Sequence, residues 1–390
     1  MTNFIIATVV AMLVASAASA APYRPSDDAT VLVTVPHAAV SMQAAFRKSQ
    51  IALAANPNDL ALALEVARAA IRDGRASADP RRYGQAQAAL APWWSIPDAP
   101  MNVRVLRAVI RQSLHDFAGA EADLDAILRL DPRNGQARLT RAFVRQTVGA
   151  LADAKDDCRR LPPSVGATAA AVCWLRVEAL TGSAGTALER LDQVIKINSQ
   201  AEPLVRRWAQ AVGADMAAML GQTEAADLRF SEATTDGGDI PTLVAFADHL
   251  LDTDRPAEVL TLLAGRSEAD IVYLRLAIAG KRLNDARAPH WAALLADRFA
   301  AARASGVQLH LREEARFELE VRGDAATALG LALANWRIQK EPSDARLVLQ
   351  TALAANDPAA AADVLAFIEK TGLADTRIKP LQDKIVEKQL

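Results

Sequence analysis

Aromatic residues make up only 5% of the sequence, although half of it is apolar. Alanine and leucine supply most of the apolar share. Sheets favour β-branched and aromatic side chains, whereas Ala and Leu are strong helix formers. The shortage of aromatics therefore argues against a sheet-rich domain and predicts an all-α fold.

Cysteine is rare as well: the sequence has two, Cys158 and Cys173. They do not form a Cys-x-x-Cys motif, so a dithiol redox site is not expected. In an oxidising compartment the pair would form a structural disulfide that stabilises the fold by roughly 3 kcal/mol for so short a loop. The alternative is that both thiols are reduced and packed as small apolar groups.

Charge of one sign is not in excess, since 44 Lys and Arg residues face 46 Asp and Glu residues. A chain that binds nucleic acid or an anionic membrane over much of its surface is usually strongly basic. The sequence therefore predicts neither partner.

Catalytic and cofactor motifs are also missing. There is no phosphate-binding loop and no dinucleotide fingerprint, and the run 181–185 resembles a nucleophile elbow with its glycine one position out of place. The five histidines do not pair at helical spacing, so we expect no metal site; they are His37, His115, His249, His290 and His310. We predict no catalytic residue and no cofactor.

The first residues carry the pattern of an export signal. Residues 4–14 are apolar and uncharged, and the small residues 18–21 follow at the distance expected of a cleavage site. A retained membrane anchor is the alternative, but it needs roughly 20 apolar residues and this run is shorter. We predict a signal peptide at 1–20, cleavage after Ala20, and a periplasmic or secreted protein without stable membrane insertion.

An internal repeat organises the rest of the chain. When residues 101–127 are shifted by 34 positions, Ala108 falls on Ala142, Ala120 on Ala154, and Leu124 on Cys158. Each copy is predicted to form two helices of about a dozen residues joined by a tight turn. A period of this length with a helix pair inside it is typical of a solenoid, in which at least three pairs must stack to bury their apolar faces.

The same pattern predicts the domain organisation. Residues 21–36 contain three prolines and are expected to form an extended lead-in. We assign residues 37–375 to the repeat array and 376–390 to a polar capping helix. In the unit at 58–94 six extra residues, 75–80, are expected to lengthen the turn.

The positions of Ala108, Ala120, Leu124 and Pro132 resemble those of the tetratricopeptide-repeat (TPR) family. The resemblance implies a right-handed superhelix of antiparallel helix pairs whose concave face binds a protein or peptide. Arg104 and Arg138 replace the large apolar residues that the family has early in the first helix. The family's Lys/Asn/Arg set for a C-terminal carboxylate is not reproduced.

Two arginine stripes repeat with the same offset, and their six members are Arg104, Arg107, Arg111, Arg138, Arg141 and Arg145. Spacings of i, i+3 and i+7 place three guanidinium groups on one helix face. One interpretation is a binding patch for a carboxylate-rich or phosphorylated partner. The other is that these arginines pair with nearby carboxylates along the solenoid; the candidates are Asp116, Glu121, Asp123, Asp125, Asp153 and Asp156.

Two functions follow from these predictions. The first is a non-catalytic exported scaffold of the cell envelope that binds other proteins, with an accessory role in a membrane transport or secretion complex as one form of it. The second is an envelope enzyme on an all-helical toroid, such as a polysaccharide lyase or hydrolase. The second would need acidic residues with Tyr or His in one cleft, and the chain has only three tyrosines.

Overall fold

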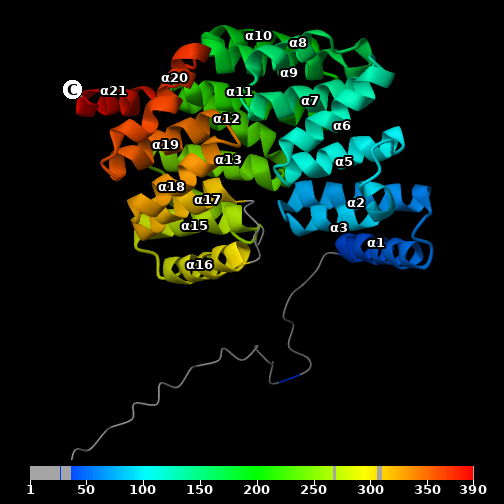
Figure 1. Cartoon of the computed structure of the whole chain (residues 1–390). Helices are drawn as coiled ribbons and strands as arrows, with labels where there is room; N and C mark the ends of the chain where they lie inside the picture. The colour runs from blue at the N-terminus through cyan, green and yellow to red at the C-terminus, as the bar shows by residue number, and fades with distance from the viewer. Residues whose placement is uncertain (1–26, 28–36, 267–268, 305–309, 390) are drawn as a thin grey trace, which may run out of the picture. The chain divides into compact units, whose positions relative to one another are not determined.

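The computed structural model describes residue 27 and residues 37–266, 269–304 and 310–389, which form helices joined by turns (Figure 1). The predicted signal peptide and, apart from Asp27, the predicted lead-in lie outside the described residues. The chain divides into two units, residues 1–47 and 48–390. The second unit holds the repeats and is described below.

The helices that open the array are α1 (His37–Ala55), α2 (Leu60–Ser77), α3 (Arg81–Ala89), α4 (Ala91–Trp94), α5 (Met101–Ser113), α6 (Phe117–Leu130), α7 (Gly135–Thr147), α8 (Leu151–Arg159), α9 (Ala167–Glu178), α10 (Ala184–Ile197) and α11 (Pro203–Met219). Those that complete it are α12 (Thr223–Ala233), α13 (Ile240–Asp252), α14 (Pro256–Leu263), α15 (Asp270–Leu283), α16 (Ala288–Ala304), α17 (Leu311–Arg316), α18 (Ala325–Trp336), α19 (Pro342–Ala354), α20 (Ala362–Thr371) and α21 (Lys379–Gln389).

Successive helices pack as antiparallel pairs, from α5 with α6 to α19 with α20. The small residues of the repeat lie where the two helices of a pair cross: Ala108, Ala120, Ala142 and Ala154 are fully buried. A methyl group at these positions lets the two backbones approach closely, and Leu124 one turn further on fills the space beside them. The predicted all-α solenoid of stacked helix pairs is confirmed.

Two predicted boundaries are wrong. The extra residues 75–80 lengthen a helix rather than the turn, because α2 continues to Ser77 and α3 packs against its last turn at Gly74. A Cβ on Gly74 would lie 3.2 Å from the ring of Tyr83, so glycine allows this contact. The last helix begins at Lys379 rather than at 376, because the backbone N–H of Thr376 donates to the carbonyl of Met219 (2.9 Å).

The last helices lie against the turns of earlier pairs. We call the turns within pairs, at residues 114–116, 148–150, 180–183, 220–222 and 253–255, the turn edge. Residues 337–378 follow this edge. Gln339 contacts His115 (3.2 Å), and the N–H of Lys340 donates to the carbonyl of Thr147 (2.8 Å). The solenoid therefore completes a turn and then stacks on itself, and Figure 1 shows α19 and α20 next to α11 and α12.

Gly182 marks the closest approach in this stacking. Its φ is +89°, a conformation that L side chains rarely adopt, and a Cβ there would lie 2.5 Å from the carbonyl oxygen of Gly372. Only glycine satisfies both conditions. The turn of the third regular pair is thus fixed by the stacking of the chain on itself.

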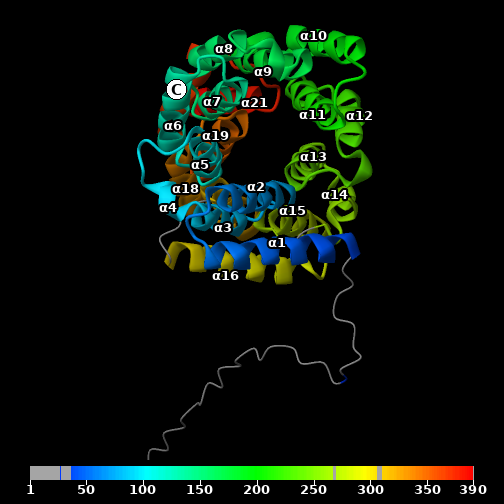
Figure 2. The ribbon, with the colours of Figure 1, turned by 90° about the vertical axis from the view of Figure 1, so that its right-hand side faces the viewer.

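The inner side of the solenoid is partly filled by the chain's own residues. One continuous apolar core joins α9–α12 to α17–α21 and includes Leu191, Met216, Trp336 and Val348. The first helices of pairs two apart also meet, because the rings of Phe143 and Trp208 lie 5.4 Å apart. The concave face expected to receive a partner is therefore not open along its whole length. Figure 2 shows the same helices arranged around the inner side of the array.

Candidate functional site

The arginine stripes lie between the helices of their own pairs. Arg104 and Arg107 are 7% and 3% exposed. Arg107 donates to both carboxylate oxygens of Asp123 (2.8 and 2.5 Å), and Arg111 donates to the same carboxylate (2.8 Å). Arg107 also donates to the backbone carbonyl of Trp94 (2.8 Å). The first stripe thus holds the preceding unit against its own pair.

The second stripe repeats this arrangement 34 residues later around Asp157. Arg138, Arg141 and Arg145 all donate to its carboxylate, at distances between 2.5 and 3.2 Å. Asp157 itself is fully buried. Asp157 is not one of the carboxylates that were expected from the sequence to pair with these arginines. Its position, 34 residues after Asp123, was the available signal.

The second stripe also ties one pair to the next. Arg141 reaches back to Asp125 (2.6 Å) and Arg145 to Glu121 (2.7 Å), both on α6. The sequence left open whether the arginines form a binding patch or pair with nearby carboxylates, and the structure shows them paired with carboxylates. Because their guanidinium groups already have partners inside the chain, we propose no ligand for these six arginines.

Cys158 of α8 and Cys173 of α9 are bonded to each other, with their Cα atoms 5.6 Å apart. Both are buried. The bond closes a loop that contains Pro162 and Pro163 and joins two successive pairs directly beside Asp157. This part of the array is therefore fixed both covalently and by ion pairs.

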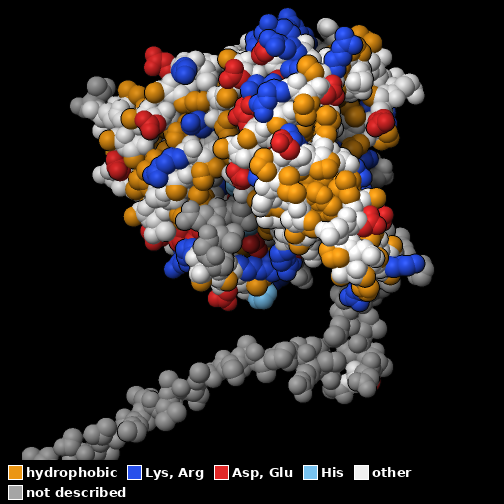
Figure 3. Space-filling view, turned by 45° about the vertical axis from the view of Figure 1, so that its right-hand side comes forward, with side chains coloured by type: hydrophobic (Ala, Val, Ile, Leu, Met, Phe, Trp, Pro, Cys, Tyr) orange, Lys and Arg blue, Asp and Glu red, His pale blue; other side chains and the backbone are white. Residues whose placement is uncertain are grey.

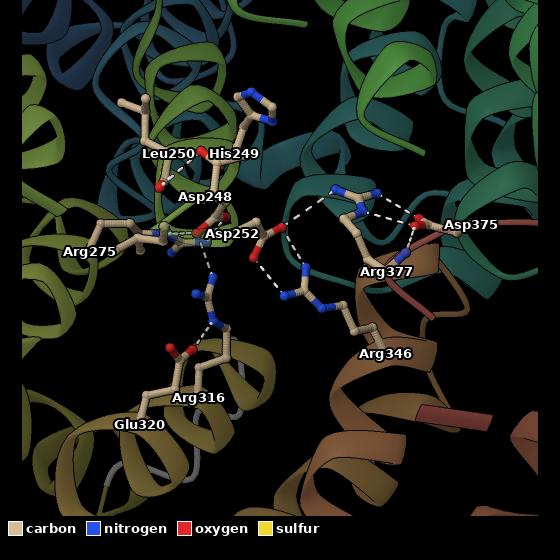
Figure 4. A network of polar contacts seen from close by, with 12 residues as sticks. Asp248, His249, Leu250, Asp252, Arg275, Arg316, Glu320, Arg346, Asp375 and Arg377 are labelled. Atoms are coloured by element: carbon tan, nitrogen blue, oxygen red, sulfur yellow. Dashed lines mark hydrogen bonds and ion pairs between the residues drawn. The ribbon is translucent and has the colours of Figure 1, made fainter. Parts of the chain in front are cut away.

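A charged cavity that the sequence did not reveal lies where α13, α15, α17 and α19 meet the segment before α21. We call it the arginine pocket. Its charged lining residues are Arg275, Arg282, Arg312, Arg316, Arg346, Arg377, Asp248, Asp252, Glu320 and Asp375. Figure 4 shows Arg275 and Arg316 directed at Asp248, and Arg346 and Arg377 directed at Asp252.

Asp248 is the carboxylate of the pocket that two arginines stabilise in its ionised form. Burial alone would raise the pKa of Asp248, but Arg275 (2.6 Å) and Arg316 (2.7 Å) outweigh it and hold this pKa well below its usual range. The pKa of the Arg316 guanidinium is raised in return, despite burial, by Asp248 and Glu320. Near neutral pH Asp248 is therefore a fixed negative charge in the pocket.

One carboxylate nearby behaves differently. Asp215 of α11 is exposed to water on the inner side of the solenoid and makes no hydrogen bond or ion pair with a described residue. Desolvation raises the pKa of Asp215 to about 6, although the charges of Arg176 and Arg377 oppose it. At neutral pH this carboxyl is still mainly ionised, but its ionisation is less favourable in the folded chain than in the unfolded one.

We expect Asp215→Asn to stabilise the fold at pH 7.5. Because the folded carboxyl keeps its proton up to about pH 6 and the unfolded one releases it near 3.8, the wild type loses stability between these values as the pH rises. The full shift corresponds to about 3 kcal/mol, and screening by the surrounding water reduces the expected gain to about 1 kcal/mol. Urea denaturation of both proteins at pH 4 and pH 7.5 measures it. A gain that is equal at both pH values would contradict the assignment.

A second surface lies on the first superhelical turn of the array, on the side opposite the turn edge. We call it the loop edge: the loops between pairs at residues 95–100, 131–134, 160–166 and 198–202, with the helix ends beside them. Large apolar side chains are exposed there, namely Ile96 (44%), Met101 (38%), Leu130 (69%), Ile197 (80%) and Leu204 (66%). Exposed basic side chains accompany them: Arg129, Arg133, Arg159, Arg160, Lys196 and Arg206.

The exposed acidic residues on these loops are Asp98, which pairs with Arg104, and Glu202. The loop edge is therefore both apolar and positively charged. In Figure 3, where this side of the molecule comes forward, hydrophobic side chains gather in a patch and Lys and Arg side chains lie above it. Contiguous exposed apolar groups of this kind mark interaction surfaces more often than ordinary surface.

The sequence matches no protein-family model and no curated protein. Yeast Tom70 has a similar structure, with 11% identity, coverage of 90% of this chain and 85% of that chain, and a TM-score of 0.39. The human IFIT1 dimer with PPP-AAAA is 13% identical to this chain, with coverage of 84% of this chain and 77% of that chain and a TM-score of 0.46. The chain is similar to TPR structures. One of these, a TPR protein from Parabacteroides merdae, is 13% identical, with coverage of 74% of this chain and 98% of that chain and a TM-score of 0.35. At these identities the likeness concerns the fold alone.

The described residues hold neither a candidate metal site nor a helix that could span a membrane. In the part of the chain that the structure describes, no cluster of His, Cys, Asp and Glu could hold a metal ion. Over the same residues no helix is long and apolar enough to cross a membrane. Of the histidines, His115 lies at a turn with φ +61° and stacks on Phe117, and His249 contacts Asp227 (2.9 Å).

Proposed function

We propose that this protein is a non-catalytic scaffold that binds a partner protein along the loop edge. The single observation that carries the proposal is the row of exposed apolar side chains on that edge. Leu130, Ile197 and Leu204 are each more than 60% exposed. Water contact at such side chains is costly, and a partner that covers them gains roughly 1.5–3 kcal/mol for each side chain that it buries fully.

The charge of the loop edge indicates the chemistry of the partner. Exposed arginines and Lys196 surround the apolar residues, whereas few acidic groups lie there. A partner surface with apolar anchors and acidic side chains around them would match both features, and the opposite charges would speed its association. We therefore propose the loops as the binding surface rather than the concave face, which the chain's own helices partly fill.

We further propose that the scaffold acts outside the cytoplasm, in the periplasm or after secretion. Two features support this location. Residues 4–20 have the pattern of a signal peptide, and the Cys158–Cys173 bond is of a kind that persists in oxidising compartments. An accessory role beside an envelope transport or secretion complex is the form of this function that we favour.

The test is capture of partners from an envelope extract by the immobilised chain from Ala21, with mass spectrometry as the readout. The critical variant carries Leu130→Asp, Ile197→Asp and Leu204→Asp. We expect at least a tenfold loss of the specific partner, because three apolar anchors are replaced by charges. Circular dichroism of the variant should match that of the wild type, since all three side chains are exposed.

The matched control changes exposed apolar residues elsewhere. Ile51, Leu283 and Val386 are 66%, 42% and 48% exposed and lie away from the loop edge. Their replacement by Asp should leave capture unchanged. If the loop-edge variant retains the partner as well as this control does, the loop edge is not the binding surface. A wild type that captures no specific protein would overturn the scaffold proposal itself.

A further inference from the structure

We propose that the arginine pocket binds a small dianion of the phosphate type, either free phosphate or the phosphate group of a monoester. This inference goes beyond the proposed scaffold function and does not depend on it. The pocket lies in the array formed by α13 to α21, whereas the loop edge is formed by α4 to α11. The two sites can therefore be tested separately.

The walls of the pocket carry more positive than negative charge. Six arginines and four carboxylates face the cavity, a difference of +2; two further carboxylates, Asp344 and Glu341, pair with Arg312 from behind and do not face it. Its volume is about 170 Å³, which corresponds to about five water molecules in the liquid. The space therefore suits one small ion with part of its hydration shell, and a dianion would balance the charge of the walls.

Donor groups in the pocket remain unused. Arg312 donates through Nε and Nη2, Arg316 through Nε and Nη1, and Arg346 through both terminal nitrogens. Among the described residues, Nη1 of Arg312, Nη2 of Arg316 and Nε of Arg346 have no hydrogen-bond acceptor, and none of the three atoms is sealed from water. Each is an N–H donor on a guanidinium group that lines the cavity.

These guanidinium groups are held in place before any ligand arrives. Arg346 donates two parallel hydrogen bonds to Asp252 (2.5 and 2.6 Å). Arg312 is fixed from behind by Asp344 (2.6 Å) and Glu341 (2.8 Å), and Arg316 by Asp248 (2.7 Å). A site whose donors are already ordered loses little conformational entropy on binding.

The donor type favours phosphate over other small anions. The pocket's cations are all arginines, and their planar forks match the oxygen pairs of a phosphate group. A monoanionic carboxylate would neutralise only half of the surplus charge. Chloride has no paired oxygens to accept the forked donors. We therefore expect the order phosphate, then carboxylate, then chloride.

Isothermal titration calorimetry of the folded chain from Ala21 with inorganic phosphate at pH 7.5 tests the site. Acetate and chloride at equal ionic strength serve as comparison anions. We expect saturable phosphate binding at least tenfold tighter than that of acetate. Glycerol phosphate distinguishes the sources, because tighter binding than inorganic phosphate assigns the pocket to a monoester and weaker binding assigns it to the free ion.

Two variants locate the binding. Arg346→Gln removes a donor that pairs with Asp252 alone among the described residues, and we expect binding to weaken at least tenfold, the loss typical of a hydrogen bond to a charged group. Gln350→Glu adds a negative charge to the lining without breaking an ion pair, and we expect a similar loss. It keeps the test valid if Arg346→Gln folds poorly.

The loop-edge triple variant is the matched control, and its phosphate affinity should equal that of the wild type. Phosphate binding no tighter than that of chloride would overturn the proposal. So would wild-type affinity in the Gln350→Glu variant, because the ion would then bind elsewhere. Loss of partner capture with intact phosphate binding would bear on the scaffold alone, which keeps the two proposals distinguishable.

Discussion

Replacing Asp157 by alanine should destabilise the protein by about 3–5 kcal/mol. The carboxylate is fully buried and accepts hydrogen bonds from three arginines. Its removal leaves Arg138, which is 7% exposed, without an acidic partner among the described residues. Buried charges that lose their counter-charge are costly because water cannot replace it. Chemical denaturation followed by circular dichroism measures the change in the free energy of unfolding.

The control for this prediction lies on the same helix. Asp153 is exposed and belongs to the first turn of α8, so Asp153→Ala should cost less than about 1 kcal/mol, the usual range for a charge at a helix N-terminus. A loss at Asp157 as small as that at Asp153 would show that the arginines find other partners or water. In that case the two stripes would not be the structural elements that we describe.

The repeat fold could be predicted because its causes are local. Ala108 and Ala120 recur at Ala142 and Ala154, and the offset alone predicts paired helices with small residues at their crossing. The arginine stripes were also visible, since helical spacing places them on one face. Their role was not visible, because it depends on whether a carboxylate on the next helix points inward, as Asp157 does, or outward, as Asp153 does.

The arginine pocket could not be predicted for a different reason. Asp252 and Arg346 are 94 residues apart in the sequence. They meet only because the solenoid stacks on its own turn edge, and no local pattern determines where a superhelix of irregular pairs will close. Gly182, which lies against Gly372, is part of this closure, but a glycine at a repeat turn is expected for the turn itself.

The loop edge illustrates a third limit. Leu130 and Ile197 are the last residues of α6 and α10, and at these positions sequence periodicity does not distinguish a buried side chain from an exposed one. In the stacked second turn the corresponding loops, at 337–341 and 372–378, are covered by the turn edge of the first. In the first turn they have no such cover. That difference, rather than residue type, leaves the apolar side chains of the first-turn loops exposed, and it is the reason why we propose these loops as the binding surface.

Loss of the Cys158–Cys173 bond should cost about 3 kcal/mol, because the bond closes a 15-residue separation and removes that freedom from the unfolded chain. We expect this loss in the double variant Cys158→Ala, Cys173→Ala, measured by denaturation without reductant. Alanine is preferred to serine because both positions are buried and a hydroxyl group would have no assured partner. The wild type treated with reductant should lose nearly as much.

Reductant separates the two contributions to this loss of stability, namely the covalent bond itself and the packing of the two sulfur atoms. It breaks the bond of the wild type but keeps both sulfur atoms in the core, so the remaining difference from the alanine variant measures packing alone. The alanine variant itself should not respond to reductant. A wild type whose stability is the same with and without reductant would mean that the packing of α8 against α9, with Asp157 and its three arginines beside it, holds this junction without the bond.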